Sequence, residues 1–350
     1  MKKAVIFGVT GQDGSYLSDL LLSLGYKVFG VARRTSTDNT TRIAHLLHCK
    51  GFELVQGDIT DCGSVYRILN EIKPNEVYNL AAQSHVWTSF EQPGLTWDVT
   101  GKGVMNILET IRNMNKRPRF YQASSSEMFG DSIEIVIIDG GQQDRYQDET
   151  TVFNPQSPYA IAKLAAHHLT CLYRRSYGLF ACSGILFNHE SERRGERFVT
   201  RKVTQYVSEL YHAQKEERDI PKLRLGNLYS ERDWGHAEDY VKAMFLMLQQ
   251  DSPDDYVIAT GETHSVEEFV IEAFKCINIY DHSNYITIDE NLYRPSEVPY
   301  LRGLPLKANT DLDWEPNVSF EELVRRMVDY DIQNRYKYGG REEVLGHGSY

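Results

Sequence analysis

Cysteine is scarce in this sequence. Only five occur among 350 residues, and they lie far apart without forming a Cys-x-x-Cys pair. This usage argues against a disulfide framework and against a zinc site, and it is typical of thiol-bearing cytosolic proteins. We therefore expect a cytoplasmic protein, and no cluster of residues in the sequence indicates a metal site.

Long apolar runs and an excess of basic charge are also missing. No stretch has the uncharged apolar length needed to cross a bilayer, and the opening residues MKKAVIFG lead into a strand without the features of a signal peptide. The formal net charge of −11 argues against nucleic acid or an acidic membrane as partner. An anionic ligand would therefore need a local basic pocket.

What the sequence does contain is an alternation of short apolar runs with amphipathic stretches. Candidate strands lie at 3–8, 27–32, 52–56, 76–81, 119–124 and 179–187. Candidate helices lie at 15–25, 64–72 and 95–113, and a further helix opens near Pro158. This order predicts an α/β fold, a doubly wound parallel sheet of the Rossmann type with helices on both faces.

The alternation loosens after residue 187. We predict a Rossmann-type domain at 1–187, to which some later segments return, a smaller lobe mainly at 188–335, and a flexible tail at 336–350. Within the lobe, Ser265 with Glu268 and Ser319 with Glu322 form capping-box patterns that predict two helix starts. The polar stretch within 131–156 predicts an exposed loop or an irregular hairpin.

Glycines at 8, 11 and 14 follow the first strand and open the first helix. The first permits a tight turn, the second lets the backbone approach a pyrophosphate, and the third allows close packing of helix and strand. Spaced glycines can also simply make a turn. Their position at the first strand-to-helix junction nevertheless favours a dinucleotide site.

The residues after the second strand indicate the cofactor. An acidic residue there would hold the ribose of NAD, but this chain has Arg33 and Arg34, which suit the 2′-phosphate of NADP. A solvated basic loop is the alternative. Asp58 follows the third strand and can accept a hydrogen bond from the adenine amino group or cap a helix.

Tyr159 and Lys163 are spaced i, i+4, so a helix places them on one face. An ammonium beside a phenol favours the phenolate and lowers a pKa that is ordinarily about 10. The pair can then act as a general base that removes a hydroxyl proton while hydride leaves the same carbon. The same spacing is common on surface helices, but here it follows a glycine loop and the stretch ASSSE at 123–127.

Together these motifs resemble the extended short-chain dehydrogenase/reductase superfamily. Longer strings are more specific, namely GVTGQDGSYL (8–17), SPYAIAK (157–163), LFNHESERRGERFVTRK (186–202), LGNLYSERDWGHAEDYV (225–241), DYVIATGE (255–262) and YRPSEV (293–298). These strings resemble, more narrowly, the GDP-mannose 4,6-dehydratase family, and the similarity extends from the start of the chain to about residue 330.

The resemblance implies an NADP-dependent lyase that forms a 4-keto-6-deoxy sugar within a homo-oligomer, a dimer or a tetramer. Tyr159 would take the C4 hydroxyl proton with help from Lys163, while Glu127 would remove the C5 proton and protonate the departing water, aided by a hydrogen bond from Ser125. Sugar-nucleotide epimerases need the tyrosine but not Glu127, so Glu127 separates these activities. A dehydratase for a related GDP-sugar such as a GDP-heptose would share all four residues.

The resemblance also implies that the domain at 1–187 binds NADP and that the lobe at 188–335 is mainly a GDP-sugar lobe. It implies a set of binding residues for each ligand. The cofactor set comprises Gly8, Thr10, Gly11, Gln12, Asp13, Gly14, Arg33, Asp58, Ile59, Leu80, Ala81, Ala82, Ser84, Lys163, His189 and Arg194. The GDP-sugar set comprises Asn188, Lys202, Leu225, Gly226, Arg232, Arg294 and Glu297. In the second set Arg232 and Arg294 would clamp the pyrophosphate, and Glu297 would bind ribose hydroxyls or serve as a structural partner of Arg294.

The chain departs from the family pattern at three places. Ser125 stands where the family usually has threonine, so the hydroxyl is kept but the methyl group that restricts its rotamer is lost. Leu95 replaces a tyrosine that lines the family's cofactor site, and the segment 131–148 is longer than expected. None of these departures removes a chemical role.

Overall fold

The computed structural model describes residues 1–137 and 143–335, which form two compact units. Unit 1 comprises Met1–His189, Glu231–Thr263 and Arg294–Val318. Unit 2 comprises Glu190–Ser230, His264–Tyr293 and the chain from Ser319 onward. The predicted flexible tail at 336–350 lies outside the described residues.

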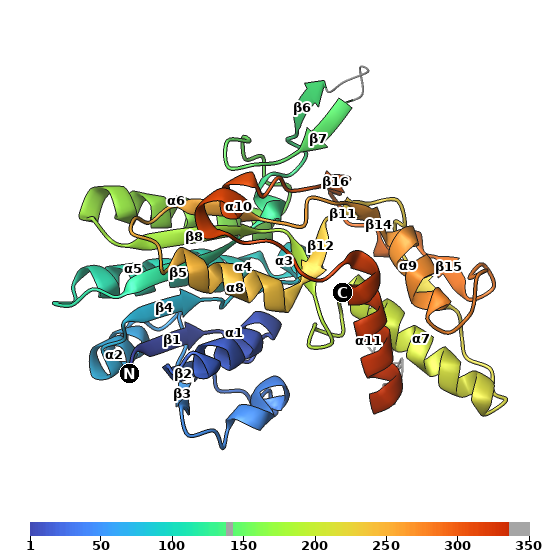
Figure 1. Cartoon of the computed structure of the whole chain (residues 1–350), viewed down its shortest axis with the longest axis horizontal. Helices are drawn as coiled ribbons and strands as arrows, with labels where there is room; N and C mark the ends of the chain where they lie inside the picture. Colours follow the sequence, from blue (N-terminus) through green and yellow to red (C-terminus); the bar gives the residue numbers. More distant parts are fainter. Residues whose placement is uncertain (138–142, 336–350) are drawn as a thin grey trace. The chain divides into compact units, whose positions relative to one another are not determined.

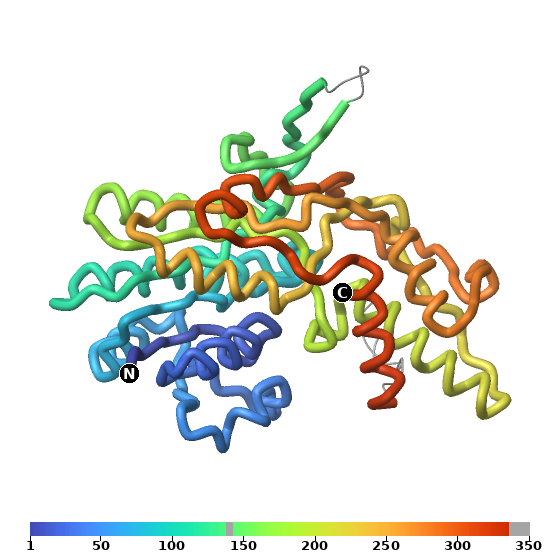
Figure 2. Tube along the Cα trace, viewed as in Figure 1, coloured from blue at the N-terminus to red at the C-terminus, as the bar shows by residue number. Residues whose placement is uncertain are grey.

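Unit 1 is built on a seven-stranded sheet in the order β13-β8-β5-β4-β1-β2-β3, in which every neighbouring pair is parallel. The strands are β1 (Lys3–Phe7), β2 (Lys27–Ala32), β3 (Phe52–Gln56), β4 (Glu76–Asn79), β5 (Arg119–Ser125), β8 (Ala181–Leu186) and β13 (Asp255–Ile258). Figure 2 shows the later chain returning to this sheet, where β13 runs beside β8.

Helices cover both faces of the sheet (Figure 1). They are α1 (Gln12–Ser23), α2 (Cys62–Ile72), α3 (Val86–Glu91), α4 (Pro93–Thr96), the π-helical segment η2 (Trp97–Lys102), α5 (Gly103–Arg112), α6 (Pro158–Tyr177), α8 (Ala237–Met247) and α10 (Leu306–Leu312). The helix predicted at 95–113 thus consists of three consecutive segments.

The two faces of β1 bury different cores because successive side chains of a strand point to opposite sides. Ala4 and Ile6 join the apolar cluster that includes residues of α1, α8 and α10. Val5 and Phe7 join the cluster that includes residues of α2, α5 and α6. This arrangement confirms the predicted doubly wound α/β fold.

Shorter elements complete unit 1. They are η1 (Thr41–Leu46), η3 (Ser126–Met128), β6 (Glu134–Ile137), β7 (Gln143–Tyr146), β9 (Asn188–Glu190), β11 (Glu231–Arg232), β12 (Trp234–His236) and β16 (Tyr300–Leu301). Of these, β9 extends by one residue into unit 2. The polar stretch forms a hairpin, because β6 and β7 pair antiparallel on either side of residues 138–142, which are not described.

Unit 2 contains three helices that pack on one another, α7 (Val199–Lys215), α9 (Val266–Lys275) and α11 (Phe320–Asn334). Its other elements are β10 (Leu223–Leu225), β14 (His264–Ser265), β15 (Ile286–Ile288) and η5 (Glu290–Leu292). Ser265 and Glu268 form a complete capping box at the start of α9, and Ser319 accepts a hydrogen bond from the Glu322 N–H at the start of α11. Both predicted helix starts are confirmed.

The assignment of the cofactor to one unit and of the GDP-sugar to the other remains a prediction. Among the described residues, no helix combines the length and the hydrophobicity required to span a bilayer.

Candidate active site

The carboxyl ends of β1, β4, β5 and β8 meet at one edge of the sheet, because these strands are parallel neighbours. Gly8 follows β1, Leu80 follows β4, Ser125 ends β5, and Asn188 comes two residues after β8. Open α/β sheets bind ligands at this edge. Residues from four distant stretches of sequence are therefore brought to the place where the predicted cofactor and substrate would meet.

The glycine loop closes tightly on its neighbours. Gly8 has φ +84°, and a Cβ atom there would lie 2.7 Å from the backbone nitrogen of Ala81. A Cβ atom on Gly14 would lie 2.5 Å from the carbonyl oxygen of Gly8. Gly11 is the N-cap of α1 and has no side chain to occupy the N–H groups of the first turn. The loop therefore fits a pyrophosphate approaching the start of α1.

Three predicted cofactor residues bond to one another. The Asp13 carboxylate contacts His189 Nε2 at 2.8 Å and accepts a hydrogen bond from Gln12 Nε2 at 3.1 Å. The same Gln12 nitrogen donates to the carbonyl oxygen of His189 at 3.0 Å. This network ties the glycine loop to the chain that follows β8, so these residues shape the site as well as line it.

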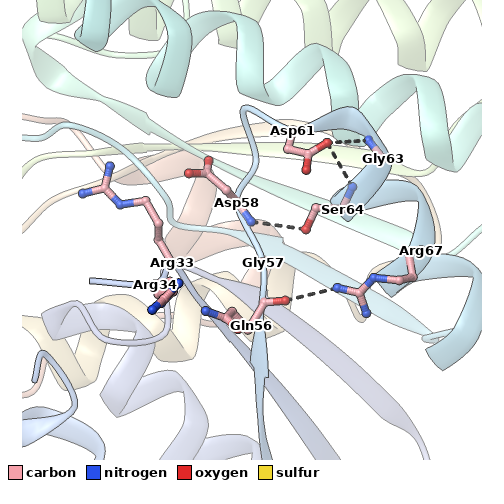
Figure 3. Close-up of a pocket in the computed structure, with 9 residues that line it drawn as sticks. All are labelled: Arg33, Arg34, Gln56, Gly57, Asp58, Asp61, Gly63, Ser64 and Arg67. Atoms are coloured by element: carbon pink, nitrogen blue, oxygen red, sulfur yellow. Dashed lines mark hydrogen bonds between the residues drawn. The ribbon is translucent and has the colours of Figure 1, made fainter. Parts of the chain in front are cut away.

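A pocket of about 670 Å³ opens where β2 and β3 end. Arg33, Arg34 and Arg67 line it together with Asp58, as Figure 3 shows. Arg67 belongs to α2, and its Nη2 donates to the carbonyl oxygen of Gln56 at 3.3 Å. The local sequence does not mark this third arginine as a pocket residue.

The acidic residues of this pocket have local roles. Asp58 Oδ1 accepts hydrogen bonds from the main chain and the hydroxyl of Thr60, at 2.9 and 2.8 Å. The helix cap is Asp61, which accepts from the Gly63 and Ser64 N–H groups. The helix-cap alternative for Asp58 is therefore wrong, because Asp58 holds the turn before the capping residue.

The other predicted cofactor residues lie in the glycine loop or on the chain that follows β3 and β4, and they differ in burial. Ile59 is buried in the core, and its carbonyl oxygen accepts from Asn106. The strand predicted at 76–81 ends at Asn79, so Leu80 and Ala81 leave the sheet beside Gly8. Thr10 lies in the glycine loop, whereas Ala82 is partly exposed and Ser84 is exposed.

The helix that carries the Tyr159–Lys163 pair has a well-defined start. Ser157 caps α6 by accepting from the Ala160 N–H at 3.1 Å, and Pro158 occupies the first turn. Tyr159 and Lys163 are both buried, and the Lys163 ammonium lies 5.8 Å from the centroid of the Tyr159 ring. Burial lowers the pKa of Lys163 to about 8, and the nearby negative charge of Asp13 opposes this shift.

Ser125 and Glu127 lie where β5 passes into η3. The Ser125 hydroxyl accepts a hydrogen bond from the Glu127 N–H at 3.3 Å. The Glu127 side chain is 12% exposed, and its Oε1 lies 3.6 Å from Nη1 of Arg294. Because α6 packs against both β5 and η3, the four predicted catalytic residues come from three adjoining elements of unit 1.

The predicted pyrophosphate clamp lies beside the predicted base. Arg232 is buried, and desolvation lowers the pKa of its guanidinium although the charges of Glu127 and Glu297 oppose the shift. Glu297 Oε1 accepts from the backbone N–H of Arg294 at 3.1 Å. Glu297 therefore contacts the main chain of Arg294, which corresponds to the alternative in which Glu297 is a structural partner of Arg294. The Arg294 guanidinium itself lies near Glu127.

Four predicted residues, Arg194, Lys202, Leu225 and Gly226, belong to unit 2. Arg194 pairs with Glu190 at 3.0 Å and lies over the ring of Phe198. Leu225 is buried at the end of β10, and its carbonyl oxygen accepts a hydrogen bond from the Asp289 N–H at 2.8 Å. A Cβ atom on Gly226 would lie 3.0 Å from the carbonyl oxygen of Leu292, which explains why this position favours glycine.

The parallel sheet, the glycine loop after β1 and the Tyr159–Lys163 pair on α6 define the class, an extended short-chain dehydrogenase/reductase. The dTDP-glucose 4,6-dehydratase of Bacillus anthracis, solved in complex with NAD, shares this fold with a TM-score of 0.79 and 18% identity, covering 96% of this chain and 98% of the other.

Sequence comparisons narrow the class to a family. The profile described as GDP-mannose 4,6 dehydratase matches residues 5–327. A GDP-mannose 4,6 dehydratase of Drosophila melanogaster is 48% identical over 356 residues, covering 95% of this chain and 86% of the relative. The GDP-mannose 4,6 dehydratase of Homo sapiens is 46% identical over 354 residues, covering 94% and 91%. The chain belongs to the GDP-mannose 4,6-dehydratase family.

Proposed function

We propose that this enzyme converts GDP-mannose to GDP-4-keto-6-deoxy-mannose and water. The observation that carries the proposal is a family match along almost the whole chain in which Ser125, Glu127, Tyr159 and Lys163 are all present. The reaction is an internal oxidation and reduction, so no oxidant or reductant is consumed. Its protons are moved by Tyr159 and Glu127, which Lys163 and Ser125 assist.

The first proton transfer occurs at the C4 hydroxyl of the hexose. Tyr159 accepts this proton as the C4–H bond breaks. The charged form of Lys163, which a pKa of about 8 leaves predominant at neutral pH, stabilises the phenolate. Lys163 is itself fixed to β5 by a hydrogen bond of 2.7 Å to the carbonyl oxygen of Ala123.

The second set of transfers eliminates water. The 4-ketone acidifies the C5 proton, Glu127 removes it, and the same carboxyl group protonates the C6 hydroxyl as the C6–O bond breaks. Ser125 donates a hydrogen bond that assists the departing water. The proton held by Tyr159 then returns to C5 as C6 is reduced, so atoms and electrons balance.

The cofactor is a nicotinamide dinucleotide, and we propose the NADP form. When bound, it supplies the chemistry of accepting hydride from C4 and returning it to C6. The glycine loop and the start of α1 would hold its pyrophosphate. Three arginines around the pocket after β2 support a 2′-phosphate rather than a free ribose hydroxyl.

The substrate's charged end would bind to arginines of unit 1. Arg232 and Arg294 supply two guanidiniums beside Glu127, which suits a pyrophosphate joined to a hexose. Within unit 1 we also assign Asn188 to this ligand. Lys202, Leu225 and Gly226 of unit 2 remain predicted GDP-sugar residues.

We further propose a homo-oligomer, a dimer or a tetramer, in which the basic loop 33–42, exposed at 33–38, contacts a neighbouring subunit. We also propose a cytoplasmic location, which the five free cysteines support. An active species that sediments only as a monomer would exclude the first of these assignments.

One experiment tests the reaction and the substrate together. GDP-mannose, GDP-heptose and other nucleotide sugars are supplied without added NADP, and the products are identified by mass and proton NMR. Loss of water with a 4-keto product from GDP-mannose alone supports the proposal. If GDP-heptose is turned over in preference to GDP-mannose, the protein is a dehydratase of that related sugar. If the product is an epimer and no water is lost, the protein has an epimerase activity instead.

A further inference from the structure

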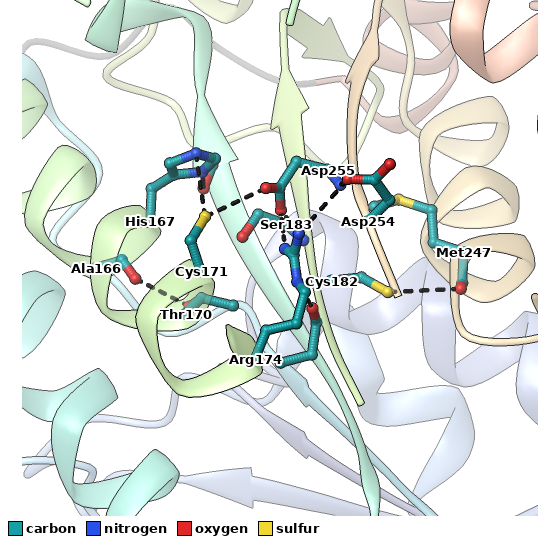
Figure 4. A network of polar contacts seen from close by, with 12 residues as sticks. Ala166, His167, Thr170, Cys171, Arg174, Cys182, Ser183, Met247, Asp254 and Asp255 are labelled. Atoms are coloured by element: carbon teal, nitrogen blue, oxygen red, sulfur yellow. Dashed lines mark hydrogen bonds and ion pairs between the residues drawn. The ribbon is translucent and has the colours of Figure 1, made fainter. Parts of the chain in front are cut away.

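A cluster of metal-binding side chains lies on the catalytic helix, outside the active site. His167 and Cys171 are spaced i, i+4 on α6 and share one face, and Asp255 begins the edge strand β13 (Figure 4). Cys171 Sγ lies 3.7 Å from His167 Nε2 and 3.2 Å from Asp255 Oδ2. All three ligand atoms lie within 4.8 Å of one another. The sequence did not reveal this cluster, because 84 residues separate Cys171 from Asp255.

These separations fit a single ion. Zinc binds sulfur at about 2.3 Å and nitrogen or oxygen at about 2.0–2.2 Å, so the edges of a tetrahedral site are roughly 3.5 Å long. The two separations from Cys171 Sγ, 3.7 and 3.2 Å, bracket this length. The third separation, between His167 and Asp255, is at most 4.8 Å, so these two side chains would close on an ion bound beside Cys171.

Further contacts orient each ligand toward the shared point. His167 Nδ1 lies 3.1 Å from the Ser124 hydroxyl, which fixes the ring and directs Nε2 at the sulfur. Asp255 Oδ1 accepts from Arg174 and from the Ser183 N–H, which leaves Oδ2 for the cluster. Outer contacts of this kind, which set the orientation of a histidine and a carboxylate, are characteristic of metal sites in proteins.

The charges of the cluster suit a divalent cation. One thiolate, one imidazole and one carboxylate match the ligand preferences of zinc and similar borderline ions.

We infer that His167, Cys171 and Asp255 bind one zinc-class divalent ion, which joins the catalytic helix α6 to the edge strand β13. Binding forms bonds from sulfur, nitrogen and oxygen to the ion and releases the thiol proton to solvent, without any redox change. The ion lies one helical turn beyond Lys163, so it would stabilise the helix that holds the Tyr159–Lys163 pair.

Cobalt is the most direct probe. The full-length protein is stripped with a chelator and titrated with Co²⁺, which gives a thiolate-to-metal charge-transfer band in the near ultraviolet when a cysteine coordinates it. We expect a band that saturates at about one equivalent per chain and is displaced by Zn²⁺. The Cys171→Ser variant should lose the band, and its thermal midpoint should no longer rise when Zn²⁺ is added.

Cys276→Ser is the matched control, because Cys276 is also partly buried on a helix end but lies outside the cluster. This variant should keep both the band and the thermal shift. The inference is overturned if wild-type protein shows no band at saturating Co²⁺, or if Cys171→Ser retains it. Loss of the band in Cys276→Ser would equally overturn it. Circular dichroism of each variant establishes that a lost band does not reflect a lost fold.

Discussion

The ammonium group of Lys163 donates a hydrogen bond of 2.7 Å to the carbonyl oxygen of Ala123. Ala123 lies in β5 two residues before Ser125, so this bond fixes the catalytic helix against the strand that presents the other catalytic groups. The arrangement places a charged amine in a buried position, where desolvation opposes its charge. Precise placement of the base is therefore obtained at a cost in stability.

That cost predicts a specific pH dependence. The pKa of Lys163 falls from 10.5 to about 8 on folding, so between these values the unfolded chain holds a proton that the folded chain lacks. Stability contributed by this group therefore rises with pH across the interval, by roughly 3 kcal/mol in total. Lys163→Met should lack this rise, so the wild-type protein should gain stability relative to the variant between pH 8 and 10.5.

The measurement is urea denaturation of both cofactor-free proteins at several pH values. The difference between the two free energies of unfolding cancels the contributions of tyrosines and other groups that titrate in the same pH range. Parallel curves for the two proteins would show that Lys163 is not the group responsible. At pH 7 the variant should be inactive whatever its stability.

Glu127→Gln should separate cofactor binding from elimination. The amide cannot remove the C5 proton or protonate the departing hydroxyl, and the loss of a general acid–base group reduces kcat by about 10²–10⁴-fold. NADP affinity should be unchanged, because the proposed dinucleotide contacts lie on other segments. Mass spectrometry of the product and calorimetric titration with NADP provide the two readouts.

The matched control is Glu134→Gln, which alters a carboxylate of the β6–β7 hairpin outside the proposed site. It should leave kcat within about twofold of the wild-type value. Full turnover by Glu127→Gln would refute the assigned role of Glu127 as base.

Arg33→Ala and Arg67→Ala should each weaken NADP more than NAD. A hydrogen bond to a charged group contributes about 1.5–3 kcal/mol, which corresponds to a tenfold or greater rise in the Kd for NADP. NAD lacks the 2′-phosphate and should lose little affinity. Arg117→Ala, an exposed arginine outside this pocket, is the control and should change neither Kd. Equal weakening of the two dinucleotides would remove the argument for a 2′-phosphate site.

The sequence predicted those features of the fold that depend on local pattern. Alternating apolar runs located all strands of the sheet up to β8, and the glycine spacing located a loop whose Gly8 and Gly14 contacts leave no room for a side chain. Ser265 and Ser319 marked helix starts because a cap depends on residues only three positions apart.

Contacts that depend on the order of strands could not be predicted in this way. Arg294 faces Glu127, and Asp255 meets Cys171, only because late segments return to the sheet beside β8 and η3. Nothing in the local sequence around Asp255 marks it as a neighbour of α6. Arg67 was missed for a related reason, since its side chain belongs to the pocket only when α2 lies beside the chain that follows β2.

Ser125 offers the final test, because it combines two functions in one hydroxyl. Its Oγ accepts the Glu127 N–H at 3.3 Å, and it is also proposed to donate to the departing water. Ser125→Ala removes both, so kcat should fall at least tenfold while substrate KM changes little. Ser125→Thr keeps the hydroxyl and adds a methyl group that restricts its rotamer, so kcat should remain within about threefold of the wild-type value.

Comparing the two variants distinguishes a chemical role from a packing role. If Ser125 served only to fill space at the end of β5, the smaller alanine would be tolerated and the larger threonine would disturb this buried position. If the hydroxyl assists elimination, the order is reversed and threonine is the better substitute. Steady-state kinetics with GDP-mannose and the thermal midpoints of both variants decide between these two orders. Only a chemical role predicts that kcat falls in the Ser125→Ala variant without a matching loss of thermal stability.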